Sequence, residues 1–319
     1  MNGQKTSSMI DPVAAAIEAE GHGLSVNPFP DEWVPSRYAR MVGNIEVLVV
    51  SDGILSIPAE TMATNADPAA RSAWLRDRFL PDQVDWAVNE VVVRSGDRTI
   101  LIDSGLGMEY PDFPRTGQWS QRVKAAGIDL ASVTDVVLTH MHFDHIGGLL
   151  VDGVKERLRP DLRVHVSTAE AESWESPDFS RTVISGAMEE LIQSAAMRFL
   201  KEYRSQLRTF ESEYEVAPGV VVTRTGGHTP GHSVVRLASG GDRLTFAGDA
   251  VLPPSFDNPD WHNGFEHDPE EATRVRIRLL RELASTGEPM VATHLPFPSV
   301  CHVAVDGDVF RWVPAIWEY

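Results

Sequence analysis

The segment THMHFDHIGG places three histidines and one aspartate within six positions of the chain. Each of these side chains, His140, His142, Asp144 and His145, is a common metal ligand, and none of them helps to fill an apolar core. His140 and His142 can contact one ion from the same side of an extended loop, whereas Asp144 and His145 are directed to a neighbouring point. Four ligands this close together are too crowded for one tetrahedral ion, so the cluster indicates two neighbouring metal ions that are both bound by this segment.

Three further segments offer ligand types next to apolar, strand-like runs. GGHTPGH contains His228 and His232 around a tight Pro-Gly turn, FAGDA places Asp249 after a strand, and VATHLPFP places His294 after another. A carboxylate that follows a strand among small residues can bridge two cations. Taken alone, His232 or His294 has an equal alternative as a hydrogen-bonded loop residue. Together with the cluster they favour a metal site, and they require a fold that brings the ends of several buried strands to one edge.

Several apolar runs predict strands that often pair as hairpins. IEVLVVSDGILSIPAE is predicted to turn at Asp52-Gly53, and NEVVVRSGDRTILIDSG at Gly96-Asp97, because each has β-branched residues around a turn dipeptide. Further strands are predicted at VTDVVLT, RVHVST, GVVVTRTGG, SVVRLASGGDRLTFAGD and PMVATH, the final clear strand. A strict alternation of strand and helix is missing. The expected fold is therefore α/β (α+β), with two mostly antiparallel sheets and outer helices rather than a doubly wound parallel sheet.

Helices are predicted at four places, one of which starts at Ala169. Residues 119–131 are helix-like, and DPEEATRVRIRLLRELAS is a well-marked helix in which Asp268 is the expected N-cap and Pro269 the first helical residue. Residues 181–209 form a long stretch with apolar residues at helical spacing. The ordinary interpretation of this stripe is core packing. The alternative is an inserted helical lid over about residues 178–210, because the stretch lies between two groups of candidate ligands.

Residues 1–40 are expected to form an N-terminal arm, because prolines at positions 28, 30 and 35 break any long element, and residues 41–319 are expected to form one domain. The first residues do not predict a secretory signal, and no apolar run reaches the length of a membrane span. Cys301 is the only cysteine, which rules out an intramolecular disulfide and a cysteine-based metal site. These features favour a cytoplasmic protein that does not act in a membrane.

The charge of the chain limits its partners. A formal net charge of -18 repels the phosphate backbones of nucleic acids, so nucleic acid is not an expected partner. The sequence also contains no basic segment interleaved with aromatic residues, which argues against a nuclease. A small molecule is the expected partner instead.

In their order and context, THMHFDHIGG, GHTPGH, GDA and THLPFP resemble the motifs of the metallo-β-lactamase superfamily. RYARMVGNIEVLVVSDG, HLPFPSVCHV and FRWVP are further similar to the branch that holds methyl parathion hydrolase and quorum-quenching lactonases, although SFDNPDWHNGFEHD differs from that branch. The resemblance extends from about Tyr38 to the C-terminus. It implies a hydrolase with an αββα sandwich of two mixed, mostly antiparallel sheets and a dinuclear site at one edge. It also suggests a homodimer.

The resemblance further implies roles for individual residues. His140, His142 and His232 would hold one divalent ion, Asp144, His145 and His294 would hold the other, and Asp249 would bridge the two. His228 matches a position that is usually not a ligand, and Asp103, in LIDSG, matches a buried acid that supports the site from behind. From the sequence itself, His302 is interpreted as a supporting or structural residue rather than a ligand.

Two such ions would lower the pKa of a bridging water, so that a metal-bridging hydroxide attacks an electrophilic carbonyl or phosphoryl centre. Asp144 or Asp249 is then expected to carry a proton to the leaving group. Asp144 is favoured, because a terminal ligand gives up coordination more easily than a bridging one. Zinc is the first expectation for a ligand set of His and Asp, with manganese, cobalt and iron as alternatives.

The expected substrate is a small, largely apolar ester or lactone, with acyl-homoserine lactones favoured. Side chains that could line its pocket, with packing between helices and loops as the alternative for each, are Trp174, Phe179, Met188, Phe199, Phe256, Trp261, His262 and Phe265. An organophosphate or aryl phosphotriester hydrolase is the alternative function. An iron-dependent redox enzyme and a non-catalytic binding module are further alternatives, but six or seven His and Asp ligands favour two metals in a hydrolase.

Overall fold

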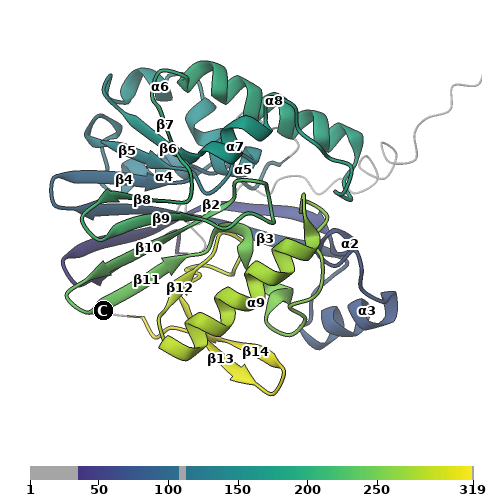
Figure 1. Ribbon diagram of the computed structural model, residues 1–319. Coiled ribbons are helices and arrows are strands. Elements are labelled where there is room, and N and C mark those ends of the chain that lie inside the picture. Colours follow the sequence, from purple (N-terminus) through teal and green to yellow (C-terminus); the bar gives the residue numbers. More distant parts are fainter. Residues whose placement is uncertain (1–34, 108–112, 318–319) are drawn as a thin grey trace, which may run out of the picture. The chain divides into compact units, whose positions relative to one another are not determined.

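The computed structural model describes residues 35–107 and 113–317 (Figure 1). From Ser36 onward the chain forms one compact unit. Most of the predicted N-terminal arm, residues 1–40, lies outside the described residues. The last residues of that range already belong to the first strand, β1 (Arg37–Val42), so the folded domain begins slightly earlier than its predicted boundary.

Two sheets of seven strands each are built from the described residues. The first sheet follows the order of the chain and contains β1, β2 (Ile45–Pro58), β3 (Gln83–Ser95), β4 (Arg98–Ile102), β5 (Asp135–Val137), β6 (Arg163–Ser167) and β7 (Leu207–Phe210). The second sheet also follows the chain and contains β8 (Glu213–Ala217), β9 (Val220–Arg224), β10 (Ser233–Ser239), β11 (Asp242–Phe246), β12 (Met290–Val291), β13 (Cys301–Asp306) and β14 (Val309–Pro314). Strands β1 to β4 pair antiparallel and β4 to β7 pair parallel. In the second sheet, β11 and β12 form a parallel pair among antiparallel neighbours.

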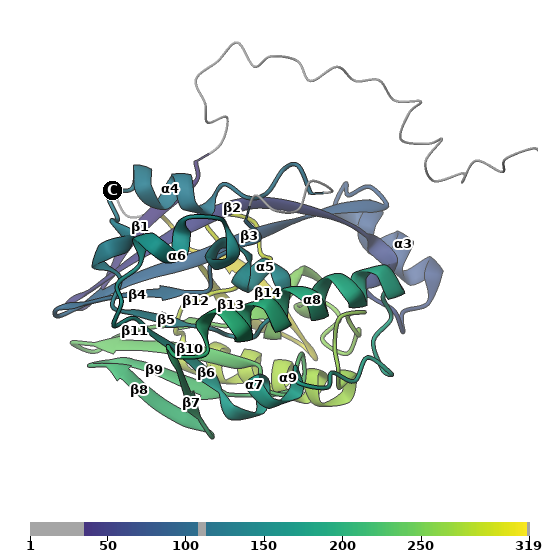
Figure 2. The same cartoon turned by 90° about the horizontal axis from the view of Figure 1, so that it is seen from above.

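Helices cover the outer faces of the sheets. They are α2 (Ala59–Met62), α3 (Pro68–Asp77), α4 (Trp119–Ala125), α5 (Phe143–Ile146), α6 (Val154–Arg157), α7 (Thr168–Ser173), α8 (Gly186–Tyr203) and α9 (Pro269–Thr286). Short 3-10 helices are η1 (Leu130–Ser132), η2 (Gly147–Leu150), η3 (Gly248–Ala250) and η4 (Pro253–Ser255). Figure 1 shows α9 in front of the second sheet, and Figure 2 shows α8 beside α5, which it contacts.

Three apolar clusters fill the spaces between these layers. Val47 and Val91 of the first sheet pack with Val222 and Leu237 of the second, so one cluster lies between the sheets. Another lies between the first sheet and the helices α4, α5 and α8, and the third packs α9 against the second sheet. Burial on both faces explains why the central strands are rich in valine and isoleucine. The predicted αββα sandwich of two mixed sheets is therefore confirmed.

The predicted hairpin at Asp52-Gly53 is wrong. β2 runs through this dipeptide as one strand of 14 residues. Gly53, with φ of 133°, forms a β-bulge against β3, and the Asp52 carboxylate accepts a hydrogen bond from the backbone N–H of Trp119. The dipeptide therefore forms part of a β-bulge, which bends the strand but does not reverse its direction. The actual turn lies at Gly43-Asn44, between β1 and β2.

Other predicted elements agree with the structure within a few residues. β3 and β4 pair around Gly96-Asp97, and the Asp268 side chain caps α9 by accepting a hydrogen bond from the backbone N–H of Glu271. The stretch predicted as helix over residues 119–131 is α4 followed by η1. The long helix α8 ends at Tyr203, earlier than predicted, because the chain then enters β7. Strands β1, β7, β8, β13 and β14 lie outside every predicted strand.

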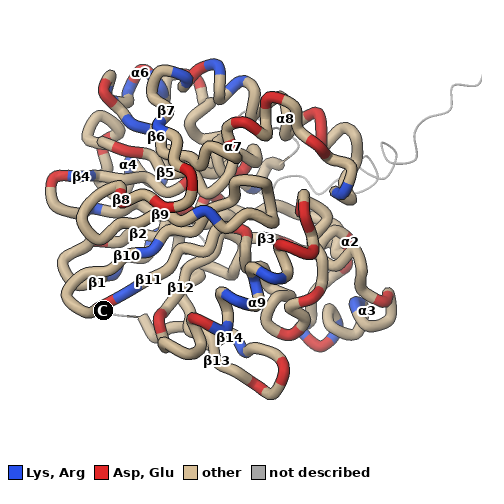
Figure 3. The backbone as a smooth tube through the Cα atoms, in the orientation of Figure 1, with Lys and Arg blue, Asp and Glu red and all other residues tan. Residues whose placement is uncertain are grey.

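The surface follows the acidic composition of the chain. Figure 3 shows Asp and Glu on helices and loops of both halves of the sandwich, with Lys and Arg interspersed among them. Within the part of the chain that the structure describes, no helix is both long and apolar enough to cross a membrane.

Candidate metal centre

The candidate ligands meet at one edge of the sandwich because of how the strands run. β4 and β5 are parallel neighbours, so Asp103 and His140, which follow them, emerge at the same edge of the first sheet. β11 and β12 are parallel neighbours in the second sheet, so Asp249 and His294 also emerge together. The turn between β9 and β10 brings His228 to the same place. Strand ends that are far apart in the sequence thus converge on one point.

The THMHFDHIGG segment forms a compact turn at that edge. His142 directly precedes α5, and Asp144 and His145 lie in the first turn of this helix. A glycine is required at position 147 because two backbone segments approach closely there, and not because of a positive φ. A Cβ atom at Gly147 would lie only 1.7 Å from the carbonyl oxygen of Leu106. The glycine therefore lets the helix carrying two candidate ligands pack directly on the loop that follows β4.

Three overlapping groups of buried side chains have ligand atoms within 4.8 Å of one another. They are His140, His142 and His228; His140, His145 and Asp249; and Asp144, His145 and His294. The Oδ1 atom of Asp249 lies 3.4 Å from Nε2 of His145. Its Oδ2 atom lies 3.1 Å from Nε2 of His294 and 3.4 Å from Nε2 of His228. The Asp249 carboxylate therefore stands between the two outer groups.

Hydrogen bonds on the far side of two rings orient them toward the cluster. Nδ1 of His145 lies 2.8 Å from Oδ2 of Asp103, and Nδ1 of His294 lies 2.7 Å from the carbonyl oxygen of Ala87. An ionised carboxylate and a carbonyl can only accept, so both rings carry their proton on Nδ1. Each ring is therefore turned with Nε2 toward the cluster, and in the neutral ring this nitrogen is the unprotonated one that a metal ligand needs.

The donor set fits two divalent metal ions. Nε2 of His140, Nε2 of His145 and Oδ1 of Asp249 are buried and have no hydrogen-bond partner among the described residues. Nε2 of His228 and Nδ1 of His142 face each other at 3.2 Å. Buried polar atoms are almost always partnered in native proteins, and metal ions held by these donors would partner them. Imidazole nitrogens with carboxylate oxygens suit zinc and other first-row divalent ions.

Electrostatics in the cluster favour the metal-binding protonation states of His140, His142 and Asp249. Burial lowers the pKa of His140 and His142 well below the usual histidine value, and neighbouring rings lower it further. Burial opposes the charge of Asp249, but His294 and His145 hold the pKa of its carboxyl well below the usual value. The neutral rings of His140 and His142 beside the ionised Asp249 are ready to bind a cation. Burial opposes the charge of His145 and His294, but the Asp144 and Asp249 carboxylates raise the pKa of both rings, so metal binding at these two residues would release protons.

The GHTPGH turn differs from the prediction, because His228 joins a ligand group and His232 joins none. Nε2 of His232 accepts a hydrogen bond from the backbone N–H of Asp249 at 3.1 Å, and its Nδ1 lies 2.8 Å from the hydroxyl oxygen of Thr225. Both ring nitrogens of His232 are therefore occupied. The structure exchanges the predicted roles: His232 supports the turn that carries Asp249, and His228 faces the cluster.

The two residues predicted to support the site behave differently. Asp103 is fully buried and lies directly behind His145, as described above. His302 lies on β13, and its Nδ1 is 2.9 Å from the carbonyl oxygen of Gly287 at the end of α9. Of the two interpretations of His302, as a supporting or as a structural residue, the structural one fits, because the ring joins α9 to the second sheet.

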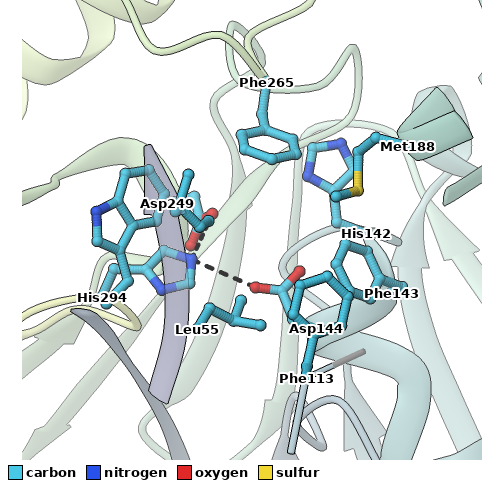
Figure 4. A pocket seen from close by; sticks show the side chains of 11 residues that line it. Leu55, Phe113, His142, Phe143, Asp144, Met188, Asp249, Phe265 and His294 are labelled. Atoms are coloured by element: carbon cyan, nitrogen blue, oxygen red, sulfur yellow. Dashed lines mark hydrogen bonds and ion pairs between the residues drawn. The ribbon is translucent and has the colours of Figure 1, made fainter. Parts of the chain in front are cut away.

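A small apolar cavity lies over the cluster (Figure 4). Its walls include His142, Asp144, Asp249 and His294, so the cavity and the ligand groups share side chains. The other lining residues are Leu55, Ile57, Trp86, Phe113, Phe143, Met188 and Phe265. Leu55 and Ile57 face it together because side chains two positions apart in a strand point to the same side. Among the residues that the structure describes, no lysine, arginine or hydroxyl side chain lines this cavity.

The prediction of the pocket residues holds only in part. Met188 and Phe265 line the cavity, and Trp174 lies behind His142 at a ring-centroid distance of 5.8 Å, with Phe179 packed on its outer side. The other four do not line the cavity. Phe199 stacks on Tyr203, Phe256 packs in the cluster under α9, and Trp261 packs on Trp74. The backbone N–H of His262 donates a hydrogen bond to the side-chain oxygen of Asn65. For these four the packing alternative is correct. The helix α8 packs in the core, and its Met188 also lines the cavity.

Solved structures share this architecture. AidC, described as a dizinc quorum-quenching lactonase in complex with a product, is similar to the chain with a TM-score of 0.81 and 26% identity. The similarity covers 89% of this chain and 99% of AidC. The hydrolase AbOPH, of the beta lactamase superfamily, is similar with a TM-score of 0.79 and 25% identity, over 90% of this chain and 100% of AbOPH.

Curated relatives give the same family. An N-acyl homoserine lactonase from Bacillus sp is 25% identical over 187 residues, which are 58% of this chain and 64% of that protein. The acyl-coenzyme A thioesterase MBLAC2 from Homo sapiens is 27% identical over 197 residues, 59% of this chain and 65% of that protein. The chain thus spans less than two thirds of the length of either relative. Residues 84–294, more than half of the chain, match the Metallo-beta-lactamase superfamily, and the chain belongs to this family.

Proposed function

We propose that the chain is a dinuclear metal-dependent hydrolase of small, largely apolar esters and lactones. The observation that carries this proposal is the position of three overlapping His/Asp ligand groups directly beneath an apolar cavity. Because Asp144, Asp249 and His294 belong to both, a molecule in the cavity would contact the metal site itself. Membership of the superfamily and the similarity to AidC, a dizinc lactonase, support the same assignment.

The proposed ligand set follows the three groups. We assign His140, His142 and His228 to one ion, Asp144, His145 and His294 to the other, and Asp249 to both. Zinc is favoured because imidazole and carboxylate ligands suit it and because AidC is a dizinc enzyme, with manganese, cobalt and iron as alternatives. When bound, two divalent ions supply Lewis-acid polarisation of the substrate and a water of lowered pKa.

The residues of the chain orient the substrate and move its protons. Trp86 and Phe265 wall the cavity and exclude water from the reacting group. We assign proton transfer to Asp144, because its carboxylate lies in the cavity wall, with Oδ2 3.4 Å from Nε2 of His294, where it can reach a leaving-group oxygen. Asp249 stays ionised between the ligand groups and holds them together. Both carboxylates are thus proposed as catalytic, in different roles.

The cavity wall favours a neutral substrate. No described wall residue is a lysine or arginine that could pair with a carboxylate or a phosphate. An acyl-homoserine lactone fits best, because its ring ester can lie at Asp144 while its acyl chain packs on Met188 and Phe265. Similarity to an N-acyl homoserine lactonase supports this choice. The anionic acyl-coenzyme A esters and β-lactam antibiotics are expected to be poor substrates.

An aryl phosphotriester is the second candidate substrate. It is also neutral and largely apolar, and it meets the same wall of aromatic and aliphatic side chains. The geometry of the ligand groups suits a phosphoryl centre as well as a carbonyl centre. The third alternative, an iron-dependent redox enzyme, requires one iron per chain rather than two ions and is separated by elemental analysis.

The function is tested by a substrate panel with zinc-loaded protein. The panel contains an acyl-homoserine lactone, an aryl ester, an aryl phosphotriester, a β-lactam and an acyl-coenzyme A. The proposal expects the highest kcat/KM with the lactone, followed by the aryl ester. A higher value with the phosphotriester selects the second candidate. A chain that binds two ions and hydrolyses none of these compounds overturns the proposed activity.

Two broader expectations complete the proposal. We propose a cytoplasmic location, because the only cysteine, Cys301, is unpaired and buried and needs no oxidising compartment. The homodimer suggested by the family resemblance stays a prediction, which light scattering on the purified chain tests.

A further inference from the structure

Glu170 is a buried carboxylate near the site that belongs to none of the three ligand groups. Four hydrogen-bond donors are directed at it. It lies on α7 and is fully buried. Its Oε1 accepts hydrogen bonds from the backbone N–H of Met141 at 2.9 Å and from Nε1 of Trp174 at 2.8 Å. Its Oε2 accepts from the hydroxyl of Thr229 at 2.6 Å and from the backbone N–H of Gly231 at 3.0 Å. Each oxygen of the Glu170 carboxylate therefore accepts two hydrogen bonds.

These donors come from the two segments that carry one of the ligand groups. Met141 lies between His140 and His142, and Thr229 directly follows His228. The three histidines form the first of the ligand groups. Glu170 thus joins the loop after β5 to the turn between β9 and β10 at points next to every member of this group, without contacting a member itself.

The start of α7 and the GHTPGH turn also interlock through their backbones. The hydroxyl of Ser167, which caps α7, donates a hydrogen bond to the carbonyl oxygen of Gly231 at 2.8 Å. A Cβ atom at Gly231 would lie 2.1 Å from the backbone nitrogen of Glu170. The absence of a side chain at Gly231 therefore lets the turn approach closely enough to bond to Glu170. The contact is built by several residues and is specific to this pair of segments.

Trp174 extends the same arrangement to the ring of His142. Its indole N–H is bonded to Glu170, and its ring meets the ring of His142 edge-on, with centroids 5.8 Å apart. Trp174 is fully buried, so its position is fixed by this contact and by the surrounding core. Glu170 therefore acts on His142 twice, through the backbone of Met141 and through the indole of Trp174.

We propose that Glu170 is a positioning residue that holds His140, His142 and His228 in the geometry of one metal site. This inference rests on the proposed dinuclear function and deepens it. The other ligand group is oriented independently, by Asp103 behind His145 and by the carbonyl of Ala87 behind His294. Loss of Glu170 therefore affects one ion of the pair, and the second ion stays bound.

The test compares metal binding by the intact chain and by three variants. Glu170→Ala removes all four hydrogen bonds, and its affinity for one of the two zinc ions is expected to fall about 10- to 100-fold, as for other residues that orient ligands. Glu170→Gln keeps the shape of the side chain and three of the four hydrogen bonds. Its amide oxygen can still accept from Met141 and Trp174, and its amide NH2 can donate to the hydroxyl of Thr229, which turns to accept. Only the N–H of Gly231 loses its partner. It is expected to bind the weakened ion with an intermediate affinity. Glu172→Ala, an exposed position on the same helix, is the matched control and should match the wild type.

The readouts separate a positioning role from a general loss of stability. Zinc titration in competition with a chelating dye gives the affinity of each ion, and circular dichroism and the melting temperature report the fold. A selective loss of one ion in a folded Glu170→Ala chain, partly recovered by glutamine, supports the proposal. If Glu170→Ala does not fold, Thr229→Val, which removes one bond, is expected to weaken the same ion to a smaller degree.

Other outcomes overturn the inference. Variants that bind both ions as tightly as the wild type, or that lose both ions equally, show that Glu170 does not position one group. A wild-type chain that takes up no pair of zinc ions contradicts the proposed function instead, so the two failures are distinguishable.

Discussion

Oδ2 of Asp103 lies 2.8 Å from Nδ1 of His145, and the same carboxylate accepts hydrogen bonds from the backbone N–H and the hydroxyl of Thr139. One buried acid thus fixes both the end of β5 and the tautomer of a candidate ligand. Asp103 has φ of 60°, a left-handed conformation that asparagine also tolerates. Asp103→Asn therefore keeps the backbone and replaces one acceptor oxygen with an N–H donor.

We expect Asp103→Asn to lower the zinc affinity of the chain about 10- to 100-fold. Without its carboxylate acceptor, the His145 ring can carry its proton on Nε2, the nitrogen that should bind the metal. The measurement is zinc titration against a chelating dye. Asp129→Asn, at an exposed helix cap, is the control. An unchanged affinity in Asp103→Asn would show that the acid does not set the state of the ring.

The two histidines of the GHTPGH turn are expected to differ when each is replaced by alanine. His228→Ala should lose one zinc ion and most of the activity, because His228 belongs to a ligand group. His232→Ala should retain both ions but unfold at a lower temperature, because the N–H of Asp249 loses its acceptor. Metal content after dialysis and the melting temperature give the comparison. The opposite result, with His232 required for the second ion, would restore the assignment made from the sequence.

Met188 is expected to select substrates by the length of their acyl chain. It reaches the cavity from α8 and is partly buried there. Met188→Ala should lower kcat/KM for a hexanoyl lactone about tenfold, because the loss of apolar contact costs roughly 1.5 kcal/mol of binding free energy. The kcat/KM for an acetyl ester should stay nearly unchanged. Met197→Ala, on the exposed side of the same helix, is the control. An equal loss for both chain lengths would contradict a contact between Met188 and the acyl chain.

Glu266 and Arg276 form a fully buried ion pair beside Phe265, and their titration gives a prediction for pH. Burial raises the pKa of Glu266 to about 7, although Arg276 opposes the shift. An unfolded glutamate has a pKa of about 4.3. Between these two values the folded state holds the proton more readily, so the contribution of Glu266 to stability falls as the pH rises from about 4.5 to about 7.

This dependence is measured by urea unfolding of the metal-free wild type and of Glu266→Gln, whose side chain stays neutral. The stability of the wild type relative to the variant is expected to decline across that range, by on the order of 2 kcal/mol, and then to level off. A relative stability that increases with pH would mean that the ion pair, rather than burial, controls the protonation of Glu266.

The metal cluster could be predicted because its information is local. His140, His142, Asp144 and His145 are neighbours in the sequence, and apolar runs followed by ligand types identify the strand ends that must meet. The choice between the two histidines of GHTPGH could not be made in this way. It depends on the backbone N–H of Asp249, which occupies the ring of His232 from 17 positions further along the chain.

The cavity and the course of β2 depend on contacts between distant segments. Gly53 forms a bulge rather than a turn, because the carbonyl of Arg115 packs where its side chain would be, at 2.0 Å from a Cβ atom. A turn dipeptide in the sequence does not distinguish these two uses of glycine. Once β2 is known to continue, Leu55 and Ile57 on one of its faces become the expected cavity wall, opposite Phe265 from a loop more than 200 residues away.

Calorimetric titration of the metal-free chain with zinc, alongside Asp249→Ala, tests whether converging strand ends hold a pair of metal ions. The wild type is expected to bind two ions. The variant lacks the carboxylate that stands between the two ligand groups, so it is expected to lose at least one ion and its activity without losing its fold. A wild type that takes up a single ion or none, or an Asp249→Ala chain that keeps two ions and full activity, would contradict the dinuclear site.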